Sequence, residues 1–125
     1  ITVRNIDDVV TVSQQVIDFC ESKGFDSRRS YFAGLCLEEM TGNVVEHGFN
    51  TDNNPHSVDI RVIKKDDNLI LRIRDNCKAF DPSERAKVMG TDKTGKNIGI
   101  QLVYKIAEKV EYQNLLGMNV LTIRI

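Results

Sequence analysis

The 125-residue sequence lacks long hydrophobic runs, an excess of one charge, and the cysteine spacing of a metal site or disulfide framework. No apolar run approaches the roughly 20 residues of a membrane-spanning helix, and no signal peptide is recognisable. The formal net charge is −1 with 28% charged residues of mixed sign, so no basic patch indicates a nucleic acid partner. Hydrophobic residues make up 41%, which is enough for the core of one domain.

Cysteine is scarce, and the number of cysteines is odd. The three cysteines are Cys20, Cys36 and Cys77, and the first two fall at apolar positions of helical patterns. We therefore expect free thiols and a reducing, cytoplasmic environment. The chain starts at Ile1 without a methionine, which leaves open that it is part of a longer protein.

Hydrophobic periodicity predicts an alternation of paired strands with three main helices. We expect strands at 1–5, 57–63, 69–75, 109–114 and 118–125, and helices at 7–22 (capped by Asp7 or Asp8), 27–47 and 98–109. The buried positions expected on the first and last helices are Val9, Val12, Val16, Ile17, Phe19 and Cys20, and Ile100, Leu102, Val103 and Ile106. A polar loop at 78–97 contains a short helix near 83–88. This order predicts a single α+β domain over 1–125, a two-layer α/β sandwich with the helices on one face of a mostly antiparallel sheet.

The helix expected at 27–47 carries polar residues where its apolar face should continue. Glu39, Asn43 and His47 are each four residues apart, and such positions on a helix are separated by about 40°. We expect this row to lie at the margin of the core and to face a cavity. Taken alone, the same pattern also fits the solvated flank of an amphipathic helix.

The three residue types in the row suit a polar ligand. A carboxylate at the margin of a core costs free energy unless it is paired or hydrated. The carbonyl oxygen of Asn43 suits a hard cation such as Mg²⁺, and Glu39 is placed to orient or deprotonate a hydroxyl or a water. His47 adds a donor near a phosphate or caps the end of the helix.

Two other stretches also suit a nucleotide. The strand "LILRIRDN" ends in Asp75, which suits a hydrogen bond from an exocyclic amine such as adenine N6, although an exposed aspartate also starts turns. The stretch "GTDKTGKNIGIQLV" places glycines before a helix, where backbone N–H groups and the positive end of the helix dipole favour phosphate. A flexible connector is the alternative for this stretch, which is not a P-loop.

In this order and spacing, the three features resemble the ATP-binding domain of the GHKL superfamily, which has the Bergerat fold and includes gyrase, Hsp90-type chaperones and histidine kinases. "EEMTGNVVEHG" is similar to its N box, "DNCKAFDP" to its first glycine box and "GKNIGIQLV" to its second. The resemblance covers essentially the whole chain. The compact size and the E-x-x-x-N-x-x-x-H form of the N box most resemble the anti-sigma factor serine kinases.

The resemblance implies a role for each motif. Glu39 is implied as the catalytic base, Asn43 as the Mg²⁺ ligand and Asp75 as the residue that binds the adenine amine. The residues implied at the nucleotide site are Asn43, His47, Asp75, Cys77, Ala79, Phe80, Gly95, Asn97, Ile98 and Gly99, and 78–97 is implied as the ATP lid. The implied partners are ATP, Mg²⁺, a serine on a STAS-type anti-anti-sigma protein, a sigma factor and a second copy of the chain.

Two residues depart from the patterns of the superfamily. Cys77 replaces the first glycine of the first box, where backbone approaches the nucleotide closely, and Asn97 replaces a glycine of the second box. We expect a functional nucleotide site whose affinity is reduced or altered. Two alternatives stay open: a non-catalytic module that binds a partner through a degenerate nucleotide site, and the ATP-binding domain of a larger sensor kinase.

Overall fold

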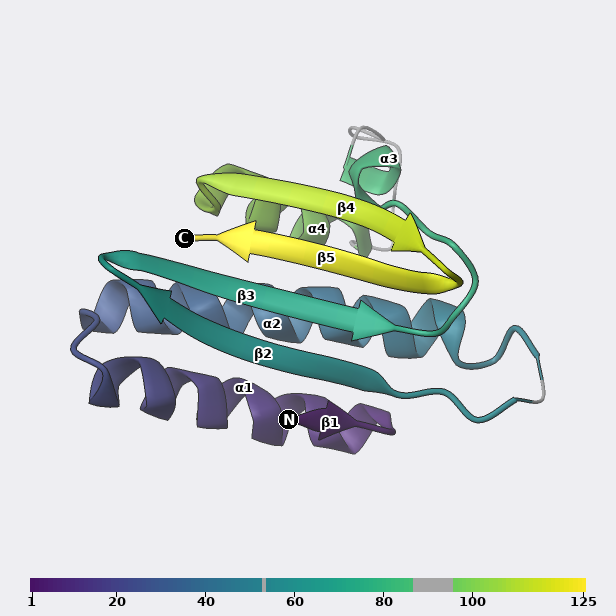
Figure 1. Ribbon diagram of the computed structural model, residues 1–125, viewed down its shortest axis with the longest axis horizontal. Helices are drawn as coiled ribbons and strands as arrows, with labels where there is room; N and C mark the ends of the chain where they lie inside the picture. The colour runs from purple at the N-terminus through teal and green to yellow at the C-terminus, as the bar shows by residue number, and fades with distance from the viewer. Residues whose placement is uncertain (53, 87–95) are drawn as a thin grey trace.

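The computed structural model describes residues 1–52, 54–86 and 96–125 (Figure 1). Its elements are β1 (Thr2–Val3), α1 (Ile6–Ser22), α2 (Ser27–Gly48), β2 (Val58–Lys65), β3 (Asn68–Asp75), α3 (Pro82–Ala86), α4 (Lys96–Ile106), β4 (Lys109–Leu115) and β5 (Met118–Arg124). The predicted order of strands and helices is confirmed. The short helix expected near 83–88 is α3, and residues 87 and 88 lie outside the described part.

The strands form one sheet with the order β1-β2-β3-β5-β4, in which every neighbouring pair is antiparallel. Helices α1, α2 and α4 lie on one face of this sheet (Figure 1). The two-layer α+β fold expected from the sequence is therefore confirmed.

Alternation along β3 and β5 sends every second side chain into the core beneath the helices. The buried apolar residues of these strands are Leu69, Leu71 and Ile73, and Leu121 and Ile123. They pack with buried helix residues that include Val16, Leu37, Met40 and Val103. At one end of the two apolar rows stand two buried polar residues, Asp75 and Asn119, which are direct partners in the β3–β5 register.

The first two helices each begin with a side-chain N-cap, but the cap of α1 is not the residue that was expected. Asn5 caps α1, because its side chain accepts a hydrogen bond from the backbone N–H of Asp8; the expected cap, Asp7 or Asp8, is wrong. Asp26 caps α2 in the same way. Gly24 follows α1 with a φ of +91°, a conformation that glycine adopts without strain.

Three further expectations about the helices are wrong. Helix α4 begins at Lys96 and ends at Ile106, because the chain from Lys109 pairs with β5. Phe19 and Leu102 are 37% and 39% exposed, whereas both were expected to be buried. Each lies at the edge of its helix's apolar stripe, where a small rotation decides which side chain faces the core.

Candidate functional site

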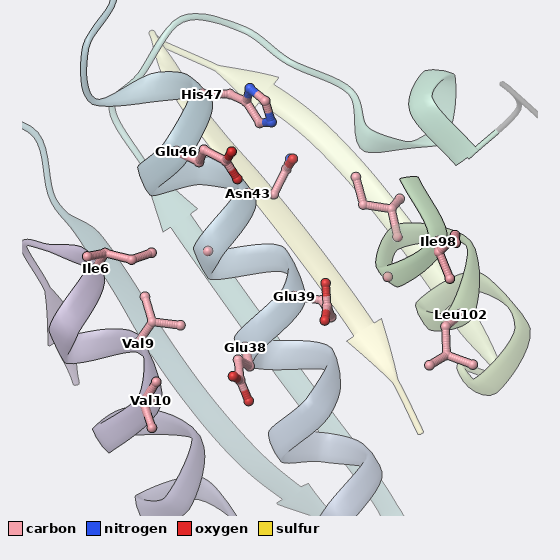
Figure 2. A pocket seen from close by; sticks show the side chains of 13 residues that line it. Ile6, Val9, Val10, Glu38, Glu39, Asn43, Glu46, His47, Ile98 and Leu102 are labelled. Carbon is pink, nitrogen blue, oxygen red and sulfur yellow. The ribbon is translucent and has the colours of Figure 1, made fainter. Parts of the chain in front are cut away.

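The polar row of α2 faces a cavity of about 610 Å³, which we call the α2 groove (Figure 2). Its lining residues are Ile6, Val9 and Val10 of α1, Glu38, Glu39, Gly42, Asn43, Glu46 and His47 of α2, and Ile98, Gly99, Ile100 and Leu102 of α4. The row therefore does face a cavity, as expected. The structure also brings Ile98 and Gly99, from the stretch similar to the second glycine box, to the same cavity.

Glu39 lies directly against the first turns of α4. A Cβ added to Gly99 would overlap the Glu39 carboxylate, so the glycine is what permits this close approach. Burial, and secondarily the charge of Glu38, raises the pKa of the Glu39 carboxyl. A carboxyl with a raised pKa is a stronger base than an ordinary glutamate once it is ionised.

Asp75 lies beside the α2 groove and not inside it. It lines a second, much smaller cavity of about 20 Å³, whose other walls are Met40, Asn43, Val44, Ile73, Phe80, Pro82, Tyr112 and Leu121. Asn43 lines both cavities. The two halves expected of a nucleotide site, the row on α2 and the aspartate at the end of β3, thus meet at one residue.

Asn119 on β5 holds the Asp75 carboxylate in place. Its side-chain Nδ2 donates to Asp75 Oδ1 at 2.9 Å and to the carbonyl oxygens of Cys77 and Lys78, each at 3.2 Å. The backbone N–H of Cys77 also donates to Asp75 Oδ1, at 2.9 Å. Both of these bonds to Asp75 end on Oδ1, so neither of them occupies the second carboxylate oxygen.

The oxygen of the Asn119 side chain extends this network across the sheet edge. It accepts hydrogen bonds from the Tyr112 hydroxyl and from Asn114 Nδ2. The Tyr112 hydroxyl in turn accepts a bond from the backbone N–H of Phe80, at 3.1 Å. Asn119 therefore links Asp75, the chain that follows it and the wall of the small cavity.

Sequence reasoning missed Asn119, although a signal for it is present. In "MNVLTIRI" the alternation that buries Leu121 and Ile123 also points Asn119 into the core, where an amide is costly unless it is fully hydrogen-bonded. The unbroken alternation of β5 therefore indicates a buried and hydrogen-bonded amide at Asn119.

Cys77 is accommodated by a glycine on α2. A Cβ added to Gly48 would lie 2.8 Å from both Cβ and Sγ of Cys77, so the cysteine side chain fills the space that a side chain at Gly48 would need. Burial, followed by the charge of Asp75 and a hydrogen bond to it, raises the pKa of the Cys77 thiol to about 12. The thiol is therefore protonated at neutral pH and is a weak nucleophile.

This packing predicts a stability coupling between Gly48 and Cys77. We expect Gly48→Ala to destabilise the domain by about 1–3 kcal/mol, since overpacking forces side chains or backbone to shift. In a Cys77→Gly background the same substitution should cost nothing or stabilise, because alanine is the better helix former. Urea unfolding of the four proteins measures the coupling; equal costs in both backgrounds would show that the contact is unimportant.

The remaining residues implied by the resemblance lie as follows. Phe80 is half-buried and lines the small cavity with Asp75, whereas Ala79 is exposed. Gly95 and the side chain of Asn97 lie outside the described part of the chain.

Within the residues that are described, no group of three histidine, cysteine, aspartate or glutamate side chains is placed to hold a metal ion. A Mg²⁺ ion would thus take Asn43 as its protein ligand together with phosphate oxygens and water, which fits its usual coordination.

No helix within the described ranges has the length and apolar character needed to cross a bilayer.

Residues 3–125 match the family of the histidine kinase-like ATPase domain. Among solved structures, the chain is similar to the histidine kinase domain from Erythrobacter litoralis EL346 blue-light activated histidine kinase, with a TM-score of 0.56 and 18% identity. That match covers 77% of this chain and 46% of the solved one, so this chain spans less than half of it. No curated protein matches.

Proposed function

The chain belongs to the histidine kinase-like ATPase domain family, and from this premise we propose that it binds ATP with Mg²⁺ and transfers the terminal phosphoryl group to a serine or threonine of a partner protein. One observation carries the proposal: Asn43 lines both the α2 groove, with Glu39 and Gly99, and the small cavity of Asp75. A nucleotide with its adenine at Asp75 would therefore extend past Asn43 toward α4.

Each residue then has a defined task in phosphoryl transfer, a reaction in which the protein mainly positions groups and stabilises charge. Asp75 would accept a hydrogen bond from the adenine amine, and the side-chain carbonyl oxygen of Asn43 would hold a Mg²⁺ ion, which would supply positive charge beside the phosphates. Glu39 accepts the proton of the acceptor hydroxyl while the hydroxyl oxygen forms a bond to the γ-phosphorus. The bond from that phosphorus to the bridging oxygen breaks, and ADP leaves with the electron pair.

The partner is proposed from the form of the N box. Glu39, Asn43 and His47 have the spacing that resembles the anti-sigma factor serine kinases, and all three line the same groove. We therefore propose a STAS-type anti-anti-sigma protein as the phosphate acceptor, a sigma factor as a second partner, and a homodimer as the working form.

A thermal-shift titration with ATP or ADP, with and without Mg²⁺, tests nucleotide binding. A ligand at about 100 times its dissociation constant stabilises the fold by about 2.7 kcal/mol, which raises the melting temperature measurably. We expect stabilisation by both nucleotides and a larger effect with Mg²⁺. Asn43→Ala should remove the Mg²⁺ increment while the protein stays folded, since the side chain is only half-buried.

A non-catalytic partner-binding module is the second candidate, and the size of the Asp75 cavity favours it. At about 20 Å³ this cavity holds about one water molecule, so adenine binding requires that its walls separate. The same titration separates the candidates, because a module with a degenerate site gives no shift at millimolar nucleotide.

A further inference from the structure

We propose that the α1 side of the α2 groove docks the substrate segment that carries the acceptor hydroxyl, and that this segment presents aliphatic side chains together with a lysine or arginine. The inference rests on the proposed kinase function and adds the chemistry of its substrate. It is drawn from the position, the exposed apolar side chains and the charge of the groove.

The position follows from the two cavities. All residues that line the Asp75 cavity come from α2, the segment 80–82 and the strands, and none of the described ones comes from α1. A nucleotide that runs from Asp75 over Asn43 to Gly99 therefore leaves the α1 side of the α2 groove uncovered. Glu39 lies on the opposite, α4 side of α2, so a segment docked on the free side must direct its acceptor hydroxyl across α2 toward Glu39.

The walls of the groove expose apolar side chains on both sides. Ile6 and Val10 of α1 are 55% and 65% exposed, and Ile98 and Leu102 of α4 are 64% and 39% exposed. Figure 2 shows the α1 residues directed toward α2 from one side and the α4 residues lying along the other. Facing rows of exposed aliphatic side chains are typical of a groove that receives an apolar segment.

The floor of the groove carries acidic side chains and a glycine, which leaves open space above it. Glu38 is exposed and lies on the α1 side of α2, whereas Glu39 lies on the α4 side (Figure 2). None of the described residues that line the groove is a lysine or an arginine. Gly42 keeps the floor open, since an added Cβ would meet nothing within 4 Å. A cationic side chain is thus attracted to Glu38, and an acidic one is repelled.

Two fluorescein-labelled helical peptides test this inference by anisotropy in the presence of Mg²⁺ and ADP. One contains leucine, serine and lysine, and in the other each lysine is replaced by glutamate. We expect the lysine peptide to bind at least about fivefold more tightly than the glutamate peptide. Glu38→Lys should reverse this preference, and Val10→Asn, which removes an apolar contact without adding charge, should weaken the binding of the lysine peptide. Both side chains are exposed, so neither change endangers folding.

Matched controls place the same changes outside the groove. Glu21→Lys and Thr11→Asn lie at exposed positions of α1 that do not line the groove, and they should leave the peptide preference unchanged. A nucleotide titration of each protein separates the two levels of the proposal. If the wild type fails to bind nucleotide, the proposed function is wrong. If it binds nucleotide but does not prefer the lysine peptide, or Glu38→Lys keeps the wild-type preference, the docking inference is overturned.

Discussion

Replacing Glu39 with glutamine is expected to slow phosphate transfer about 100- to 10,000-fold while the protein still binds ATP. Glutamine keeps the size of the side chain that lies against Gly99, but it cannot accept the hydroxyl proton. The rate is measured with radiolabelled ATP and each STAS-type protein encoded in the same genome, and nucleotide affinity is measured alongside. Glu21→Gln, at an exposed position of α1 away from both cavities, is the matched control and should transfer phosphate at the wild-type rate.

The pH profile of the wild type supplies a second readout of the same role. Burial and the neighbouring Glu38 raise the pKa of Glu39, and only the ionised carboxylate accepts a proton. The rate should therefore fall on the acid side at a higher pH than an ordinary glutamate would cause, and Glu39→Gln should lack this acid limb. Wild-type transfer by Glu39→Gln would show that Glu39 is not the base.

Replacing Asn119 with alanine is expected to abolish most of the preference for ATP over ITP, the analogue with an oxygen in place of the adenine amine. Asn119 Nδ2 is a hydrogen-bond donor to Asp75, and a bond to a charged group contributes about 1.5–3 kcal/mol. Without it, of the two bonds to Asp75 Oδ1, only the one from the Cys77 backbone N–H remains, so the carboxylate is held less firmly toward the base. We expect ATP affinity to fall about 10- to 100-fold and ITP affinity to fall much less.

The ratio of the two affinities distinguishes positioning from general stability. A merely structural loss would weaken ATP and ITP alike and would leave the ratio unchanged. Asn114→Ala is the control, because Asn114 bonds the oxygen of Asn119 and makes no bond to Asp75. In Asp75→Ala the preference for ATP over ITP should vanish completely. An unchanged ratio of the two affinities in Asp75→Ala would show that adenine does not bind at Asp75.

The fold was predictable because apolar periodicity is strong in its main elements. Alternation in β3 and β5 and the apolar stripe of α2 are local properties of the sequence, and the antiparallel pairs β2–β3 and β4–β5 follow from short hairpin turns. Errors arose where a decision depends on the partner element. Phe19 and Leu102 lie at the edges of apolar stripes, and only the packing of α1 and α4 decides how much of each stays exposed.

The polar row of the candidate site was predicted, but Asn119 and the shape of the site were not. The row at Glu39, Asn43 and His47 follows from helical spacing alone, so its gathering along one groove was foreseeable. The separation of Asp75 into an adjoining cavity was not, because it depends on how the chain after β3 folds over the sheet. The pairing of Cys77 with Gly48 likewise joins positions far apart in sequence, and neither residue alone signals the other.

A crystal structure of the protein with Mg²⁺ and a non-hydrolysable ATP analogue would locate the nucleotide. We expect one nucleotide with its exocyclic amine within hydrogen-bond distance of Asp75, a metal ion on the Asn43 side-chain oxygen, and the terminal phosphate between Glu39 and the start of α4. The small cavity at Asp75 should have widened to admit the base. A nucleotide bound elsewhere, or a base that does not contact Asp75, would show that these two cavities do not form the ATP site.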